Sequence, residues 1–246
     1  MFIQDTCITR AWRSIIIQAL KAPYLNPLIV KIDIENKQQF EDINLKISID
    51  RFIISMGFQS IDTVANTIFP LNLWNPDLDR QILYKRYIDT WSKIIKYKTN
   101  YLGTYFQRMI AYGDNKNLSE GINQLEHVIC TWKNGNHRKS ALQVSIFDPL
   151  LDHNNMRQRG FPCIQQIGFI PKGSNGKDGL LLYALLPRQT IIERTYGNLL
   201  GLVNLGKFMA KEMDLELKQI NIFVSYAELD CAKKKLVGLK NILKIT

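Results

Sequence analysis

Cys163 and Arg188 are the two residues of this sequence whose types and positions could together do chemistry. Cys163 follows a proline at the start of an apolar run over residues 164–171, and Arg188 follows a second apolar run over residues 180–186. The polar, glycine-rich segment 172–179 between the two runs predicts a β-hairpin. Both side chains would then lie at the same end of the paired strands. A nearby guanidinium favours the thiolate, which is the nucleophilic form of cysteine.

The residues around this pair extend the pattern over residues 101–230. In chain order, the segments are residues 102–112 (LGTYFQRMIAY), 122–125, 142–149, the Pro-Cys pair at 162–163, Arg188, and Asn198 at the start of a long apolar helical pattern that ends near residues 214–216 (DLE). No single segment is specific, but their order resembles the thymidylate synthase family. The resemblance covers the middle and C-terminal parts of the chain, and residues 1–100 carry no match.

In that family a Pro-Cys thiolate adds to C6 of a pyrimidine, an arginine binds the 5′-phosphate and an asparagine recognises the base. The resemblance implies these roles for Cys163, Arg188 and Asn198, with Tyr105 lining the pocket near the thiol. Asn198 favours uracil, because the cytosine-acting members carry an aspartate there. Structural alternatives stay open for all four. Cys163 and Tyr105 would also suit a core, Arg188 a surface strand end, and Asn198 a helix N-cap.

Other positions depart from the family pattern. Gln189 replaces the serine that follows the phosphate-binding arginine. Glu228 and Asp230 fall where the family has the His and Tyr that bind the sugar hydroxyl, and two exposed residues at a strand end are the alternative. Arg138, followed by Lys139, lies two positions before the arginine pair that reaches the partner subunit's phosphate site. The tail that closes over the folate in the family has no counterpart.

Two functions follow from these matches and departures. The first is a divergent enzyme that adds the Cys163 thiolate to C6 of a pyrimidine nucleotide, with uracil the expected base, and transfers a one-carbon unit to C5. The resemblance implies methylenetetrahydrofolate as donor and a homodimer. The alternative is a nucleotide-binding or scaffolding module on the same fold, without turnover. The three histidines lack metal-ligand spacing, so no metal site is predicted.

Helical and strand patterns alternate, which predicts an α+β fold: a thymidylate-synthase-like mixed sheet packed with helices, as a single domain over residues 1–246. The helix predicted at 47–56 is expected to be buried. The helix predicted at 77–98 is expected to bury one face, formed by Leu78, Ile82, Tyr87, Trp91, Ile94 and Ile95. The predicted helices are 9–21, 47–56, 60–68, 77–98, 118–132 and the one beginning at Asn198, and the predicted strands are 28–34, 140–147, 164–171, 180–186 and 220–224.

Composition limits the class of protein. The 246 residues carry a net charge of +10, which attracts anions in general, but no aromatic side chains interleave the lysines as in single-strand nucleic-acid binders. The most apolar N-terminal run, residues 14–20, is too short to span a bilayer. The four cysteines show no paired spacing, which favours a reducing, cytoplasmic compartment.

Overall fold

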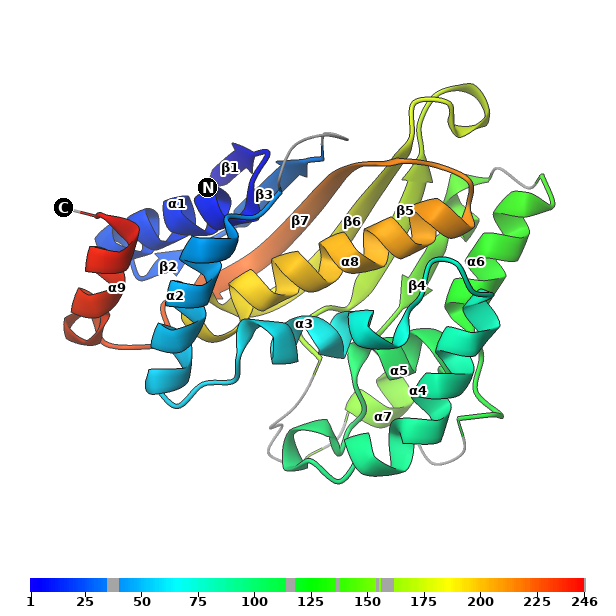
Figure 1. The fold of residues 1–246 in the computed structure, drawn as a ribbon, viewed down its shortest axis with the longest axis horizontal. Coiled ribbons are helices and arrows are strands. Elements are labelled where there is room, and N and C mark those ends of the chain that lie inside the picture. Colours follow the sequence, from blue (N-terminus) through cyan, green and yellow to red (C-terminus); the bar gives the residue numbers. More distant parts are fainter. Residues whose placement is uncertain (35–39, 114–117, 136–137, 154, 156–161, 246) are drawn as a thin grey trace.

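A mixed β-sheet organises the chain in the computed structural model, which describes residues 1–34, 40–113, 118–135, 138–153, 155 and 162–245 (Figure 1). Within these ranges the sheet has seven strands in the order β1-β3-β7-β6-β5-β4, with β2 paired to β7. The strands are β1 (Phe2–Asp5), β2 (Tyr24–Leu25), β3 (Leu28–Asp33), β4 (Gln143–Ser145), β5 (Gln166–Pro171), β6 (Leu180–Thr190) and β7 (Leu217–Glu228).

Helices pack against this sheet, and α8 runs across it as the central element (Figure 1). The α+β class and the mixed sheet predicted from the sequence are therefore confirmed. The helices are α1 (Ile8–Lys21), α2 (Ile43–Ser55), α3 (Ile61–Ile68), α4 (Arg80–Ile94), α5 (Tyr105–Ile110), α6 (Gln124–Lys133), α7 (Pro149–Asp152), α8 (Tyr196–Glu212) and α9 (Val237–Leu243).

Two glycines let α3 cross α8 at short range. A Cβ atom added at Gly197 would lie 2.5 Å from the Cβ of Val64, and one added at Gly201 would lie 2.8 Å from the carbonyl oxygen of Ala65. Backbones approach this closely only where side chains are missing. The contact fixes the start of α3, and with it Gln59, beside the start of α8.

The first hundred residues, which match no family segment, belong to the same core. β1 and β3 form one edge of the sheet, and α1 packs against α8. The indole Nε1 of Trp12 donates to the carbonyl oxygen of Ile191 at 3.1 Å, and the hydroxyl groups of Thr9 and Tyr196 lie 2.7 Å apart. The N-terminal part therefore braces the backbone that leads into α8.

The other face of the sheet carries an apolar row that solvent reaches. Phe2 pairs with Ile29, Ile29 with Phe223, and Phe223 with Leu185, so the four side chains cross four neighbouring strands. Phe2 is 57% exposed and Phe223 is 41% exposed, while Ile29 and Leu185 are partly buried. Their neighbours along each strand point into the helical layer and are buried.

The helix predicted at residues 47–56 exists, but the prediction that it is buried is wrong. It begins earlier, as α2 (Ile43–Ser55), and only one side of it meets the core. Ile49 and Ile53 are buried, whereas Ile47 is exposed. The run of isoleucines indicated burial on all sides, but α2 packs chiefly against α9 at the edge of the molecule.

Helix boundaries shifted where a capping side chain intervened. Asp79 accepts a hydrogen bond from the backbone N–H of Gln81 and starts α4 three residues after the predicted position. Its buried side chains are Leu83, Tyr84, Tyr87 and Trp91. The predicted face is therefore right at Tyr87 and Trp91 and wrong at Leu78 and Ile82, which are exposed. Asn123 caps α6 in the same way, which delays that helix to Gln124.

Candidate functional site

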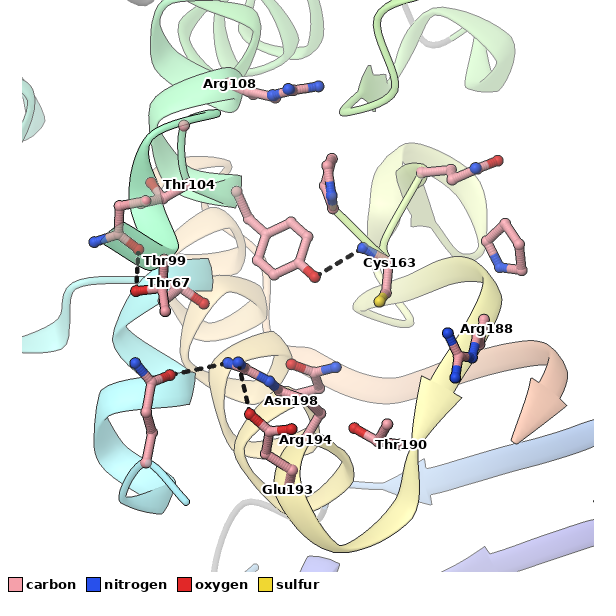
Figure 2. A pocket seen from close by; sticks show the side chains of 17 residues that line it. Thr67, Thr99, Thr104, Arg108, Cys163, Arg188, Thr190, Glu193, Arg194 and Asn198 are labelled. Atoms are coloured by element: carbon pink, nitrogen blue, oxygen red, sulfur yellow. Dashed lines mark hydrogen bonds and ion pairs between the residues drawn. The ribbon is translucent and has the colours of Figure 1, made fainter. Parts of the chain in front are cut away.

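A pocket of about 460 Å³ opens beside the end of β6, between the start of α8, α3 and α5 (Figure 2). Its lining includes Cys163, Arg188, Asn198 and Tyr105, four of the residues expected from the sequence to form a site. They come from different elements and from distant parts of the chain. The volume is within the range of small-molecule pockets, which is about 300–1,000 Å³.

The predicted hairpin is confirmed and explains why Cys163 and Arg188 meet. Gln166 on β5 pairs with Leu185 on β6 in antiparallel register. Continuing that register outward places Cys163, three residues before Gln166, at the end of β6 that carries Arg188. Figure 2 shows both side chains at the same side of the pocket.

Tyr105, at the start of α5, holds the cysteine from the opposite wall. Its hydroxyl oxygen accepts a hydrogen bond from the backbone N–H of Cys163 at 3.0 Å, and its hydroxyl also interacts with the thiol. Thr104 caps α5 by accepting from the N–H of Gln107 at 3.1 Å, and its hydroxyl lies 2.6 Å from that of Tyr87. The phenol therefore sits on a fixed helix end.

Burial governs the acidity of the Cys163 thiol. Removal from water raises the pKa of Cys163, and the charges of Arg194 and Arg188 and the hydrogen bond from Tyr105 act in the opposite direction without cancelling it. Glu193 adds a smaller raising effect. Arg188 thus acts in the expected direction, but the resting group at neutral pH is the thiol.

Arg188 and Glu228 form an ion pair at the mouth of the pocket. Arg188 extends from β6 with its side chain 65% exposed, and Glu228 ends the neighbouring strand β7. The carboxylate raises the pKa of the Arg188 guanidinium by direct hydrogen bonding. Glu228 itself does not line the pocket. Its predicted contact with a sugar stays a prediction.

Asn198 lies inside a helix and not at its cap. A π-helical turn, Ile191–Thr195, leads directly into α8, so the backbone is already helical before Asn198. The N-cap alternative is therefore wrong. The side chain is 2% exposed and lines the pocket, and its carboxamide oxygen has no hydrogen-bond partner among the described residues. The hydroxyl of Thr190, also in the lining, is unpartnered in the same sense.

Asp230 supports the turn that carries these residues. Its two carboxylate oxygens accept hydrogen bonds from the backbone N–H groups of Ile192 and Glu193 at 2.7 and 2.9 Å. Burial nevertheless raises the pKa of Asp230. Asp230 and the buried Gln189 both lie outside the pocket lining. Neither position, therefore, offers a side chain to the pocket in this structure.

Arg138 is exposed and lies outside the lining of the pocket. Its Nε donates to the hydroxyl of Ser140 at 2.9 Å. The expectation for Arg138 concerned the site of a partner subunit, so a single chain does not test it. Its contact with a partner's phosphate site stays a prediction.

Arg194 and Arg108 line the pocket, and sequence reasoning missed both. Arg194 donates from Nη1 to the side-chain oxygen of Gln59 at 3.0 Å, and its Nη2 lies 2.8 Å from a carboxylate oxygen of Glu193. Arg108 is buried in an ion pair with Asp152, at 2.5 and 2.8 Å. The position of Arg108 in the 102–112 segment was a usable signal, whereas nothing in the sequence pattern marked Arg194.

Comparison with known proteins adds no family to this picture. A scan against protein-family models finds no matching model, and a search of curated proteins finds no matching protein. In the described part of the chain, no three His, Cys, Asp or Glu side chains are grouped so that they could hold a metal ion. The helices described there are all too short or too polar to cross a membrane. The pocket is therefore the feature of this chain that bears on its function.

Proposed function

We propose that this chain binds a uracil nucleotide and adds the Cys163 thiolate to C6 of its base, which prepares C5 for one-carbon transfer. The observation that carries the proposal is that Cys163, Arg188, Asn198 and Tyr105 line one pocket. They are the residues to which the resemblance to thymidylate synthases gives the roles of nucleophile, phosphate ligand, base-recognising amide and thiol neighbour. A pattern of chance matches would have no reason to converge on one cavity.

The unpartnered oxygen of Asn198 supports uracil as the base. A buried carboxamide oxygen without a hydrogen bond costs about 1–3 kcal/mol, which a ligand donor can relieve. The N3–H of uracil is such a donor, and the amide nitrogen of Asn198 could donate to O4. In the same orientation of the carboxamide, neutral cytosine would place its N3 acceptor against this oxygen and its 4-amino group against the amide nitrogen, so both contacts would be lost unless the carboxamide turned over.

The proposed step balances without a redox partner. The thiol proton is lost to solvent, the sulfur forms a bond to C6, and the C5=C6 π pair moves to C5 and O4 as an enolate. C5 then takes a proton or a one-carbon electrophile and loses its original proton to solvent, and the electron pair left on C5 re-forms the C5=C6 double bond as the thiolate is expelled. Because burial raises the pKa of Cys163, loss of the thiol proton limits the step at neutral pH.

The lining does not by itself fit a folate. Tyr105 is the only aromatic side chain among the described lining residues, and it is hydrogen-bonded to Cys163. A pterin would find no further aromatic ring to stack on there. The proposal therefore assigns the nucleotide step to these residues, and methylenetetrahydrofolate enters only as an arm of the experiment.

A nucleotide-binding or scaffolding role without turnover is the second candidate. Two observations favour it. Burial raises the pKa of Cys163, which keeps the nucleophile protonated, and Glu228 neutralises Arg188 at the pocket mouth. A binding module needs neither a thiolate nor a free phosphate-binding charge.

Release of tritium from C5-labelled dUMP, UMP, dCMP and CMP, with and without methylenetetrahydrofolate, tests the proposal. We expect release from a uracil nucleotide by the wild-type protein and none by Cys163→Ala. Folate dependence would distinguish one-carbon transfer from proton exchange. Binding of each nucleotide is measured in parallel by calorimetry. Nucleotide binding without any release contradicts the enzyme and favours the binding module.

We also propose that two copies of the chain associate through the open face of the sheet. The cross-strand row Phe2, Ile29, Phe223 and Leu185 supports this, since a second copy would cover the same apolar row on both partners. Sedimentation analysis should give a dimer, which Phe223→Lys dissociates. Leu150→Lys, at an exposed position on α7, is the matched control. A monomeric wild-type protein contradicts the proposal.

The proposed chemistry requires a reduced Cys163, which agrees with the cytoplasmic compartment expected from the sequence. Cys7, Cys130, Cys163 and Cys231 are all free thiols. Disulfides are rare in reducing compartments. Thiol titration of unfolded protein purified without reductant should find all four as thiols, and a disulfide would contradict this part of the proposal.

A further inference from the structure

Among the described residues that line the pocket, three carry guanidinium groups, and they differ in how much charge they leave available to a ligand. The terminal nitrogens of Arg108 are hydrogen-bonded within the protein. They donate to both carboxylate oxygens of Asp152 and to the carbonyl oxygens of Ile146 and Leu102. The ion pair is buried on both sides. Its net charge toward a ligand is therefore small.

Arg188 and Arg194 are the two remaining candidates for stabilising negative charge on Cys163. Arg188 is 65% exposed and pairs with Glu228, so water and the carboxylate both weaken its field. Arg194 is 32% exposed and is also paired with a carboxylate, that of Glu193, to which a dashed line joins it in Figure 2. It lines the pocket four residues before Asn198 on a continuous helical backbone. A charge of the same size acts more strongly where less water screens it.

The turn that carries Arg194 is fixed on several sides. Asp230 accepts hydrogen bonds from its backbone N–H groups at Ile192 and Glu193. Trp12 donates to the carbonyl oxygen of Ile191, and the Thr195 hydroxyl donates to the backbone carbonyl oxygen of Thr190. Gln59, from the segment before α3, orients the guanidinium itself. A group held in this way does not have to reorganise when charge develops next to it.

We propose that Arg194 makes Cys163 reactive: its guanidinium stabilises the thiolate before addition and the enolate oxygen after addition. The stabilisation of the thiolate does not depend on the proposed function, whereas that of the enolate rests on it. During addition the negative charge moves from sulfur toward O4, the atom that Asn198 would recognise. Arg194, which lines the same pocket as Asn198, keeps its proton throughout.

The electrostatic surroundings of the thiol agree with this assignment. Four groups act on it from the elements packed around it: Arg194 and Glu193 on the turn, Arg188 on β6 and Tyr105 on α5. Arg194 is the strongest of those that lower the pKa of Cys163, ahead of Arg188, and Glu193 raises it. Replacing each arginine in turn should therefore lower the reactivity of Cys163 by different amounts.

The rate of Cys163 alkylation by iodoacetamide, followed from about pH 6 to about pH 10, distinguishes the effect of Arg194 on the thiol from that of Arg188. Mass spectrometry of the peptide that contains Cys163 excludes contributions from the other three thiols. Below the thiol pKa, Arg194→Gln should slow alkylation at least about threefold and shift the pH profile upward. Arg188→Gln should slow it less, and Arg194→Lys, which keeps the charge, should stay close to wild type.

Equal slowing by the two Gln variants, or greater slowing by Arg188→Gln, overturns the proposal. Circular dichroism and thermal unfolding identify any variant that misfolds. Glu193→Gln provides a second measurement if Arg194→Gln does not fold, because removing this carboxylate should speed alkylation at the same pH. An unchanged or slower rate in Glu193→Gln also counts against the proposal.

Tritium release from the nucleotide that binds then tests the enolate. If the wild-type protein releases tritium, Arg194→Gln should lose at least about tenfold in rate with nucleotide affinity changed much less. Retention of the wild-type rate overturns that half. If the wild-type protein releases none, the proposed function fails, and the alkylation profiles still decide the role of Arg194 at the thiol.

Discussion

Two walls of the same pocket differ in how completely the protein satisfies its own polar groups. On the wall formed by α5, Arg108 is neutralised by Asp152, which lies on α7 outside the pocket lining, and two backbone carbonyl oxygens take further donors of Arg108. On the wall formed by β6 and the turn into α8, the Asn198 carboxamide oxygen and the Thr190 hydroxyl are buried without partners in the described structure.

The difference separates a structural wall from a binding wall. Most buried polar groups in folded proteins are hydrogen-bonded, so unpartnered ones beside a cavity indicate where a ligand would supply the missing contacts. Arg188 and Arg194 belong to this second wall, and both are partly exposed. Substitutions on the first wall should therefore change stability, and those on the second should change binding and reactivity.

Arg108→Ala should give the largest effect, because it leaves the Asp152 carboxylate buried without its cation. We expect the free energy of unfolding to fall by about 3–5 kcal/mol in urea denaturation. The double variant Arg108→Ala/Asp152→Ala is the control and should recover part of the loss, since it removes the uncompensated charge. A loss below about 1 kcal/mol for the single variant would mean that the first wall is not structural.

Asp230→Ala should have an intermediate effect, because it removes the acceptor for the backbone N–H groups of Ile192 and Glu193. The expected loss is about 1–3 kcal/mol of unfolding free energy. Asp230→Asn keeps one acceptor oxygen and should lose less. Slower alkylation of Cys163 in Asp230→Ala would sharpen the comparison by showing that the turn positions Arg194. Full stability in Asp230→Ala would contradict the bracing role.

Glu228→Gln should give the smallest effect, and in the direction of a gain. It releases Arg188 from its ion pair, so the guanidinium is free to bind a phosphate. Exposed ion pairs contribute less than about 1 kcal/mol, which limits the gain in dUMP affinity to about fivefold in calorimetry. Glu216→Gln, which releases Lys218 on another part of the surface, is the control and should leave affinity unchanged. A weaker affinity in Glu228→Gln would indicate that Glu228 itself contacts the nucleotide.

Patterns in the sequence predicted Arg188 and Asn198 on the second wall, but not Thr190 or Arg194. The hairpin followed from two apolar runs and a glycine-rich turn, and its register alone brings Cys163 and Arg188 to one end. Asn198 was predicted from the resemblance to thymidylate synthases, which places this residue at the start of a long apolar helical pattern. The hairpin depends on one antiparallel pair, which sequence periodicity encodes directly, whereas the prediction of Asn198 depends on the order of segments along the chain.

Arg194 could not be predicted in the same way. Between Arg188 and Asn198 the chain is one residue shorter than the family pattern, so residue-by-residue comparison leaves open which side chain faces the pocket. The π-helical turn Ile191–Thr195, which is wider than an α-helical turn, determines which side chains before α8 face the pocket. Contacts from Trp12 and Asp230, both distant in sequence, hold that turn.

The α+β class, the hairpin and the approach of a thiol to a guanidinium follow from the sequence, because alternation and turn residues act over short distances. Three outcomes required the folded chain: burial outweighs the cations at Cys163, Glu228 pairs with Arg188, and Arg194 lines the pocket. These outcomes depend on the removal of water and on close packing, such as Gly197 against Val64, between segments far apart in the chain. Desolvation and packing are properties of the assembled core, and no local run of residues specifies them.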